Sequence, residues 1–296
     1  LDESNVCITM SGTNALLDIF LAIVNPGDKV MIPEPYFPLY PPDVVICGGT
    51  PSFYPCKFEN GFVPSISDLE EIVDSDTVAI VYNFPSNPTG GNVNEEQRDQ
   101  LVDFARKNDL WLISDEVYDR IVYDGPHVSF LGSGYDKMVM VQSFSKTFAM
   151  TGWRVGWMIG PTDLIMAAQN LQSHSTSNVC NVAQAAALAA VSGPLDAVEE
   201  MREAFDRRRR KMHSLLVAIE GVDCPEPQGA FYAYPDFSRL LGDTFRGHTP
   251  NTTLELADAL LEEIKVAVVP GEAFGVGGGA RLSFALSDDD LSEGVE

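Results

Sequence analysis

The sequence predicts an α/β fold: a large domain with a mainly parallel central sheet flanked by helices, followed by a smaller α+β domain. Through residue 160, short apolar runs typical of buried strands alternate with stretches of helical spacing. Such alternation is typical of parallel strands joined by right-handed crossovers. After residue 161 the pattern changes to long helices, and from residue 228 to alternating strands. We therefore expect a large domain at residues 1–205 and a smaller one at 206–296.

The large domain contains the apolar runs that we interpret as strands. A helix is expected at 15–24, ended by Asn-Pro-Gly-Asp, and another at 94–108 with Asn94 as its N-cap. Residues 35–42 form a proline-rich turn. Strands are expected at 6–10, 29–33, 44–46, 77–82, 111–114, 138–141 and 155–160.

Long helices open the remainder of the chain. They are expected at 162–173, 182–191 and 194–219. The last of these contains a basic run at 207–211, which we interpret as a solvated helix face because acidic residues flank it. Anion binding is the alternative. A helix at 253–263 and strands at 266–269 and 281–285 complete the smaller domain.

The composition is strongly acidic: 43 acidic residues face 19 basic ones, for a net charge of −24. Such a charge repels itself at low ionic strength and is used by halophiles. We interpret it as the mark of a halophilic source with a salt-rich cytoplasm; an acidic mesophilic protein is the alternative. Because phosphate backbones attract basic surfaces, the charge argues against nucleic acid or an anionic membrane as partner.

Cysteine and histidine spacing gives no sign of a metal site or a disulfide framework. The five cysteines are scattered without a CxxC pair, and the four histidines form no HExxH motif. No apolar run reaches the roughly 18 residues of a membrane span. The first residues lack the basic start of a signal peptide. A cytoplasmic protein is expected.

The most informative residue is Lys146, in Ser143-Phe144-Ser145-Lys146, directly after the apolar run 138–141. A lysine whose pKa is lowered by burial and nearby cations is a nucleophile that forms a Schiff base with aldehydes. Neighbouring serines and Arg154 suit a phosphate group. An aldehyde and a phosphate together describe pyridoxal phosphate (PLP). A solvent-facing lysine after a buried strand is the alternative.

Other polar residues also follow predicted strands, at the edge where parallel sheets bind ligands. Ser11-Gly12-Thr13 opens a helix, whose free N–H groups bind phosphate, although it could be a simple N-cap. Asn87 lies in a turn rich in proline and glycine and could donate to a phenolic oxygen. Asp115 ends the strand 111–114, with Tyr118 behind it. A buried carboxylate is costly unless paired, and a protonated pyridine nitrogen is a suitable partner.

These motifs, in this order, resemble the class I and II aminotransferases of PLP fold type I. The resemblance extends over essentially the whole chain. Compared with the family, we expect the chain to lack an N-terminal segment and to end within the last helix of the small domain. The matching motifs are SGTNAL at 11–16, NPTG at 87–90, DEVY at 115–118, SFSK at 143–146, RVG at 154–156 and RLS at 281–283.

The resemblance implies roles for individual residues. Lys146 would hold the cofactor as a Schiff base and move a proton during catalysis, and Asp115 would keep the pyridine nitrogen protonated. Tyr118 and Asn87 would bond the phenolic oxygen. Arg281 would grip the substrate α-carboxylate, with a surface salt bridge as the alternative, and Asn87 would also contact the substrate. Phe37, or else Tyr36, would stack on the ring, and the phosphate would lie among Ser11, Gly12, Thr13, Ser143, Ser145 and Arg154.

The activity implied is transamination between an amino acid and a 2-oxo acid, by a homodimer. The sequence Gly-Trp-Arg-Val-Gly-Trp at 152–157 resembles that of the prokaryotic aspartate and aromatic aminotransferases. Aspartate with 2-oxoglutarate is therefore favoured. Two alternatives share the same residues: a PLP-dependent C–S lyase, and the aminotransferase-like sensor domain of a PLP-binding transcription regulator.

Overall fold

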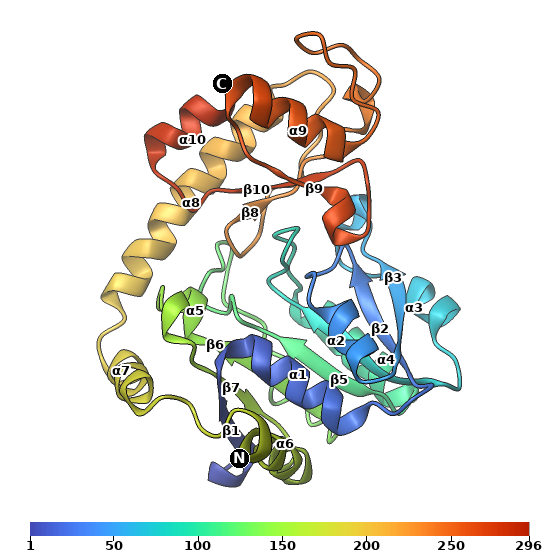
Figure 1. The fold of residues 1–296 in the computed structure, drawn as a ribbon, viewed down its shortest axis with the longest axis vertical. Coiled ribbons are helices and arrows are strands. Elements are labelled where there is room, and N and C mark those ends of the chain that lie inside the picture. The colour runs from blue at the N-terminus through green and yellow to red at the C-terminus, as the bar shows by residue number, and fades with distance from the viewer. Residues whose placement is uncertain (296) are drawn as a thin grey trace.

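A mainly parallel sheet forms the centre of the molecule, as predicted. The computed structural model describes residues 1–295; Glu296, the last residue of the predicted small domain, lies outside them. Within this range seven strands form the sheet in the order β1-β7-β6-β5-β4-β2-β3 (Figure 1), and only β7 runs antiparallel to its neighbours. The strands are β1 (Val6–Thr9), β2 (Lys29–Glu34), β3 (Thr50–Pro55), β4 (Thr77–Asn83), β5 (Trp111–Asp115), β6 (Met138–Ser143) and β7 (Gly156–Ile159).

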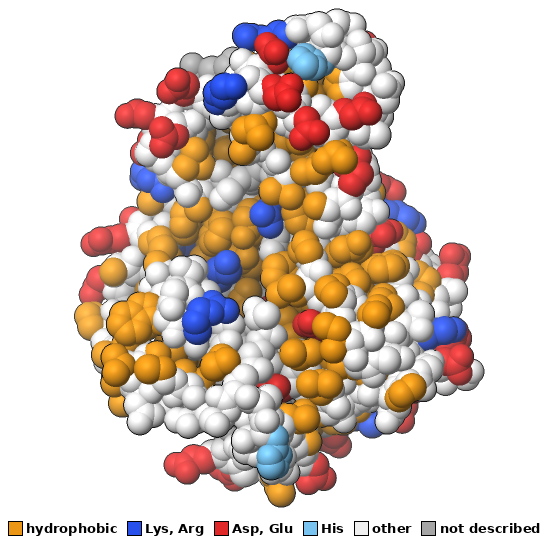
Figure 2. Space-filling model, viewed as in Figure 1, with side chains coloured by type: hydrophobic (Ala, Val, Ile, Leu, Met, Phe, Trp, Pro, Cys, Tyr) orange, Lys and Arg blue, Asp and Glu red, His pale blue; other side chains and the backbone are white. Residues whose placement is uncertain are grey.

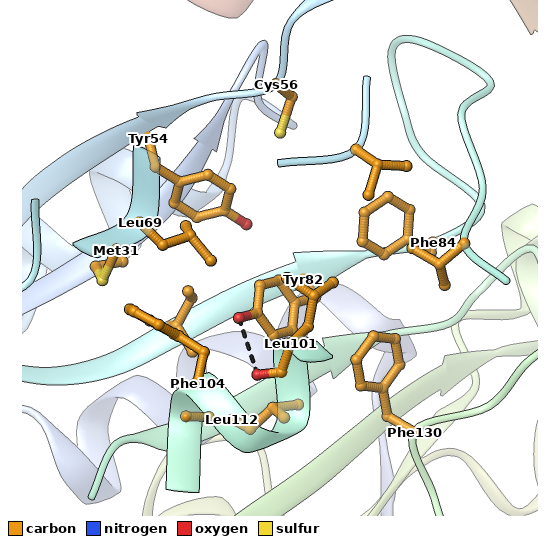
Figure 3. Packing of buried hydrophobic residues seen from close by; sticks show 14 of the residues in the cluster. Met31, Tyr54, Cys56, Leu69, Tyr82, Phe84, Leu101, Phe104, Leu112 and Phe130 are labelled. Atoms are coloured by element: carbon orange, nitrogen blue, oxygen red, sulfur yellow. Dashed lines mark hydrogen bonds between the residues drawn. The ribbon is translucent and has the colours of Figure 1, made fainter. Parts of the chain in front are cut away.

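Alternate side chains of each central strand enter two different cores, one on each face of the sheet. Ile80 and Tyr82 lie in one core, whereas Val81 between them lies in the other. This is the two-residue period of a strand buried on both faces. In the first core the Tyr82 hydroxyl donates to the Leu101 carbonyl at 3.3 Å (Figure 3).

Helices cover both faces. α1 (Ser11–Ile23) and α6 (Thr162–Ser175) pack on one face, and α3 (Ile66–Ile72) and α4 (Glu95–Lys107) on the other. The expected N-cap Asn94 does cap α4, since its side chain accepts the Gln97 N–H. The remaining helices are α2 (Tyr40–Ile46), α5 (Phe144–Thr147), α7 (Asn181–Ser192), α8 (Asp196–Leu216), α9 (Thr253–Ile264) and α10 (Asp288–Val295).

The strand predicted at 44–46 is wrong. These residues belong to α2, where prolines stand at the first helical positions. Proline is tolerated there because its missing N–H would have no partner in the first turn. The true strand is β3, which the sequence reading missed because prolines interrupt it. β3 lies at the edge of the sheet, where proline can be accommodated.

A second, antiparallel sheet forms the smaller part of the chain. Its three strands within the described range are β8 (Tyr232–Ala233), β9 (Val269–Pro270) and β10 (Ala280–Ser283), in the order β8-β10-β9. α8 runs from the region of the large sheet to this second sheet (Figure 1). The domain boundary predicted after residue 205 therefore falls inside an unbroken helix.

The solvated basic face predicted at 207–211 needs one correction, because Arg209 is only 2% exposed. It shares a helix face with buried Phe205 and Met212, at spacings of four and three residues. Its guanidinium pairs with Asp124 and Asp206. The buried arginine thus fastens α8 to the large part of the molecule.

No helix within residues 1–295 combines the length and the apolar character needed to cross a membrane.

Candidate active site

A cavity opens where the large sheet faces the smaller part of the chain. Figure 2 shows a hollow there, lined by hydrophobic side chains and containing Lys and Arg side chains. All predicted site residues except Arg281 line this cavity. The lining residues are Ser11, Gly12, Thr13, Leu16, Phe37, Asn83, Asn87, Asp115, Val117, Tyr118, Ser143, Ser145, Lys146, Thr151 and Arg154.

Lys146 projects from α5, a short helix that begins where β6 ends. The Ser143 hydroxyl caps this helix by accepting the Ser145 N–H at 3.1 Å. The Lys146 ammonium lies 5.7 Å from the centre of the Tyr118 ring. Burial lowers the pKa of Lys146, and the Arg281 and Arg154 charges lower it further, against the opposing effect of Asp115. A lysine in this environment is a better nucleophile than one in water.

The first turn of α1 has features that suit an anion. The helix starts at Ser11 instead of residue 15, so the Ser-Gly-Thr turn supplies N–H groups that have no partner inside the helix. Arg154 donates to the Ser11 hydroxyl at 2.5 Å. Gly156 makes this approach possible, because a Cβ there would lie 2.6 Å from the Ser11 carbonyl carbon. A phosphate dianion fits such a site.

Asp115 ends β5 and is 4% exposed. The Tyr40 hydroxyl donates to its carboxylate at 2.7 Å. Burial raises the pKa of Asp115 to about 6, despite this hydrogen bond and the nearby Lys146 charge. A buried carboxylate whose charge is poorly compensated favours a cationic partner, such as a protonated ring nitrogen.

Arg281 reaches the site from β10. Its guanidinium donates to the Asn87 side-chain oxygen at 2.8 Å and lies over the rings of Tyr232 (4.5 Å) and Phe274 (5.0 Å). These contacts differ from the surface salt bridge considered as an alternative. An arginine held by an amide and two aromatic faces has donors left for a carboxylate.

Of the two aromatic candidates, Phe37 lines the cavity. Tyr36 instead stacks on Phe53 with ring centres 5.2 Å apart. The sequence reading missed Tyr40, which carried no signal in its proline-rich segment. It also missed Asn83, which donates to the Asp115 carbonyl at 3.0 Å. Asn83 ends β4, and the rule applied to the other strand ends could have identified it.

Comparison with known proteins gives one consistent family. The sequence model of aminotransferase class I and II matches residues 1–296. Aspartate aminotransferase of Streptomyces avermitilis is 50% identical over 299 residues, covering 100% of this chain and 73% of the relative. Aspartate/prephenate aminotransferase of Cereibacter sphaeroides is 40% identical, covering 98% of this chain and 74% of the relative.

A solved structure agrees in fold. Aspartate aminotransferase of Thermus thermophilus with maleate superposes with a TM-score of 0.93 at 34% identity. The match covers 100% of this chain and 75% of that one. The chain belongs to the class I and II aminotransferase family.

Proposed function

We propose that this aminotransferase binds PLP in the cavity around Lys146 and transfers amino groups from aspartate to 2-oxoglutarate. One observation carries the proposal: Lys146, whose pKa is lowered, lines the same cavity as the N-terminus of α1 and the buried carboxylate of Asp115. These three features match the aldehyde, phosphate and ring nitrogen of one molecule.

Each polar group of PLP has a partner among the lining residues. Asp115 would pair with the ring nitrogen, Tyr118 and Asn87 with the phenolic oxygen, and Phe37 would lie against the ring. Bound PLP supplies a reactive aldehyde and a protonated ring that accepts electrons from the carbon beside the amine. The phosphate would be held by Ser11, Gly12, Thr13, Ser143, Ser145 and Arg154.

The protein residues then orient the substrate and move protons. Arg281 binds the α-carboxylate, and its hydrogen bond to Asn87 sets the position of both side chains. Once free, the Lys146 amine takes the proton from the substrate α-carbon, because its lowered pKa leaves it neutral more often. The same amine would then donate this proton to the cofactor carbon that receives the amino group.

Aspartate as substrate is supported by the aspartate aminotransferases among the relatives. We also propose a halophilic source, supported by the net charge of −24. The five cysteines are all free thiols in the structure. Free thiols are typical of a reducing compartment, and we therefore propose that the protein lies in the cytoplasm.

A homodimer is proposed from the apolar surface on and beside α7. Val182 is 70% exposed, Leu188 65% and Trp153 46%. Trp153 and Val182 line the same open groove. Exposed apolar side chains gathered in this way are typical of protein interfaces.

Lys146→Ala is expected to lower kcat for transamination by about 10⁴-fold, because no other residue along the cavity wall within residues 1–295 carries an amine that could move the proton. It should also remove the absorbance of the lysine-bound cofactor. Oxaloacetate formation from aspartate and 2-oxoglutarate measures the activity, with alanine and tyrosine as competing donors. Lys137→Ala is the control, since Lys137 pairs with Asp109 before β6. Wild-type absorbance in the Lys146 variant would contradict the proposal.

Asp115→Asn is expected to stabilise the cofactor-free protein by about 3 kcal/mol near pH 8. Folding raises the pKa of Asp115 from 3.8 to about 6. Ionisation of this residue therefore destabilises the native state as the pH rises above 3.8, and the full cost is reached above pH 6. The difference should shrink as the pH falls through 6 and vanish below 4. Urea unfolding at several pH values measures it.

The same variant should bind cofactor yet lose at least about 100-fold in transamination, because a neutral ring accepts electrons poorly. Asp99→Asn, at a side chain 66% exposed, is the matched control. If Asp115→Asn left both the pH dependence and the rate unchanged, the role given to this carboxylate would be wrong.

Salt is expected to stabilise the protein. Between roughly 0.2 M and 2 M KCl, Tm should rise by about 5 °C or more, because the salt screens repulsion among the acidic side chains. Calorimetry measures the change. A Tm that stays flat or falls would reject the halophilic source and favour an acidic mesophilic protein.

Sedimentation velocity is expected to give about twice the 32.3 kDa chain mass. Replacing Val182 and Leu188 together by Asp should shift the population toward monomer, because burying a charge in an apolar interface is costly. Val217→Asp, at an exposed site on the C-terminal end of α8, is the control. A monomeric wild type would contradict the proposal.

A further inference from the structure

Tyr232 contacts residues at both ends of the proposed site. It lies on β8 and is 6% exposed. Its hydroxyl oxygen is 3.0 Å from that of Tyr118, and its ring lies under Arg281 at 4.5 Å. The backbone adds a third link, since Tyr232 is paired with Ser283, two residues beyond Arg281 on β10. One residue thus joins the tyrosine proposed for the cofactor to the arginine proposed for the substrate.

We propose that Tyr232 is a positioning residue with two functions. Its hydroxyl donates to Tyr118, so that the Tyr118 proton is directed to the phenolic oxygen of the cofactor. Its ring holds the Arg281 guanidinium ready for the substrate carboxylate. The inference rests on the PLP-binding function proposed above and extends it to a residue outside the cavity lining.

The direction of the hydrogen bond follows from counting protons. Each tyrosine hydroxyl has one proton to donate and lone pairs to accept. Without cofactor, either hydroxyl can be the donor. A phenolic oxygen carrying negative charge is the stronger acceptor, so Tyr118 donates to it, and the proton between the two tyrosines must then come from Tyr232. Hydrogen bonds in such a chain strengthen one another.

The surrounding charges support this arrangement. Arg281 from β10 faces the Tyr232 ring, while Lys146 from α5 and Asp115 from β5 face Tyr118. Burial raises the pKa of Tyr232, and the Arg281 charge acts against this rise. A cation over the ring makes the hydroxyl a better donor. The ring in turn attracts the guanidinium through its negative face.

Tyr232→Phe separates the two functions, because it removes the hydroxyl and keeps the ring. With Tyr118 a weaker donor, the bound cofactor should hold its proton to higher pH. The midpoint of its absorbance titration is expected to rise by about 0.5, while KM for the amino acid stays within about twofold. Tyr232→Leu also removes the ring, and KM should rise about tenfold.

Tyr234→Phe is the matched control. Tyr234 lies two residues along the chain, is also buried, and its hydroxyl finds no hydrogen-bond partner among residues 1–295. This variant should leave both the titration and KM unchanged. Far-ultraviolet circular dichroism and Tm establish that each variant is folded.

The outcomes separate this inference from the proposed function. A wild-type protein without absorbance that depends on Lys146 would overturn the proposed function and this inference with it. If the wild type titrates but Tyr232→Phe has the same midpoint, the hydroxyl has no such function. If Tyr232→Leu has the KM of Tyr232→Phe, the ring does not position Arg281. A shift of equal size in Tyr234→Phe would also overturn the inference.

Discussion

The burial of the Asp115 carboxylate at the end of β5 is the constraint on which the rest of the site depends. A carboxylate removed from water is costly, and neighbouring groups must offset the cost. The Tyr40 hydroxyl donates to it, and Asn83 holds the backbone carbonyl of the same residue. Asn83 also accepts the Asn87 N–H at 2.8 Å. The hydrogen bonds that keep the carboxylate in place therefore also position the next polar residue of the cavity.

The sheet supplies the geometry for this arrangement. Both of its faces are covered by packed side chains, and the carboxyl ends of its central strands bring side chains that are distant in sequence to one edge. The antiparallel strand β7 adds a second constraint. It passes so close to the start of α1 that only glycine fits at position 156. That contact brings Arg154 to Ser11, in the turn that we propose to bind the phosphate.

Much of this could be predicted from sequence because strand ends are visible as polar residues after apolar runs. Asp115 and Lys146 are such residues, and the parallel sheet and the family were predicted correctly. Tyr40 and Tyr232 reach the site through tertiary packing, which leaves no local pattern. For Arg209, helical periodicity did contain the signal, since it repeats the spacing of its buried neighbours. Its charge alone suggested a solvated side chain, but the packing of α8 against the large part of the molecule buries it.

The two parts of the chain meet at the site through side chains instead of a continuous sheet. Arg281 bonds Asn87, and Tyr232 bonds Tyr118, each pair joining the small sheet to a segment that follows a strand of the large one. Because β8 and β10 are hydrogen-bonded neighbours, Arg281 and Tyr232 are held in the same small sheet. A displacement of this sheet relative to the large one would therefore affect both contacts together, Arg281 with Asn87 and Tyr232 with Tyr118. On the function proposed above, this shared ladder would connect the residue that binds the substrate carboxylate to the residue that positions the donor of the cofactor phenol.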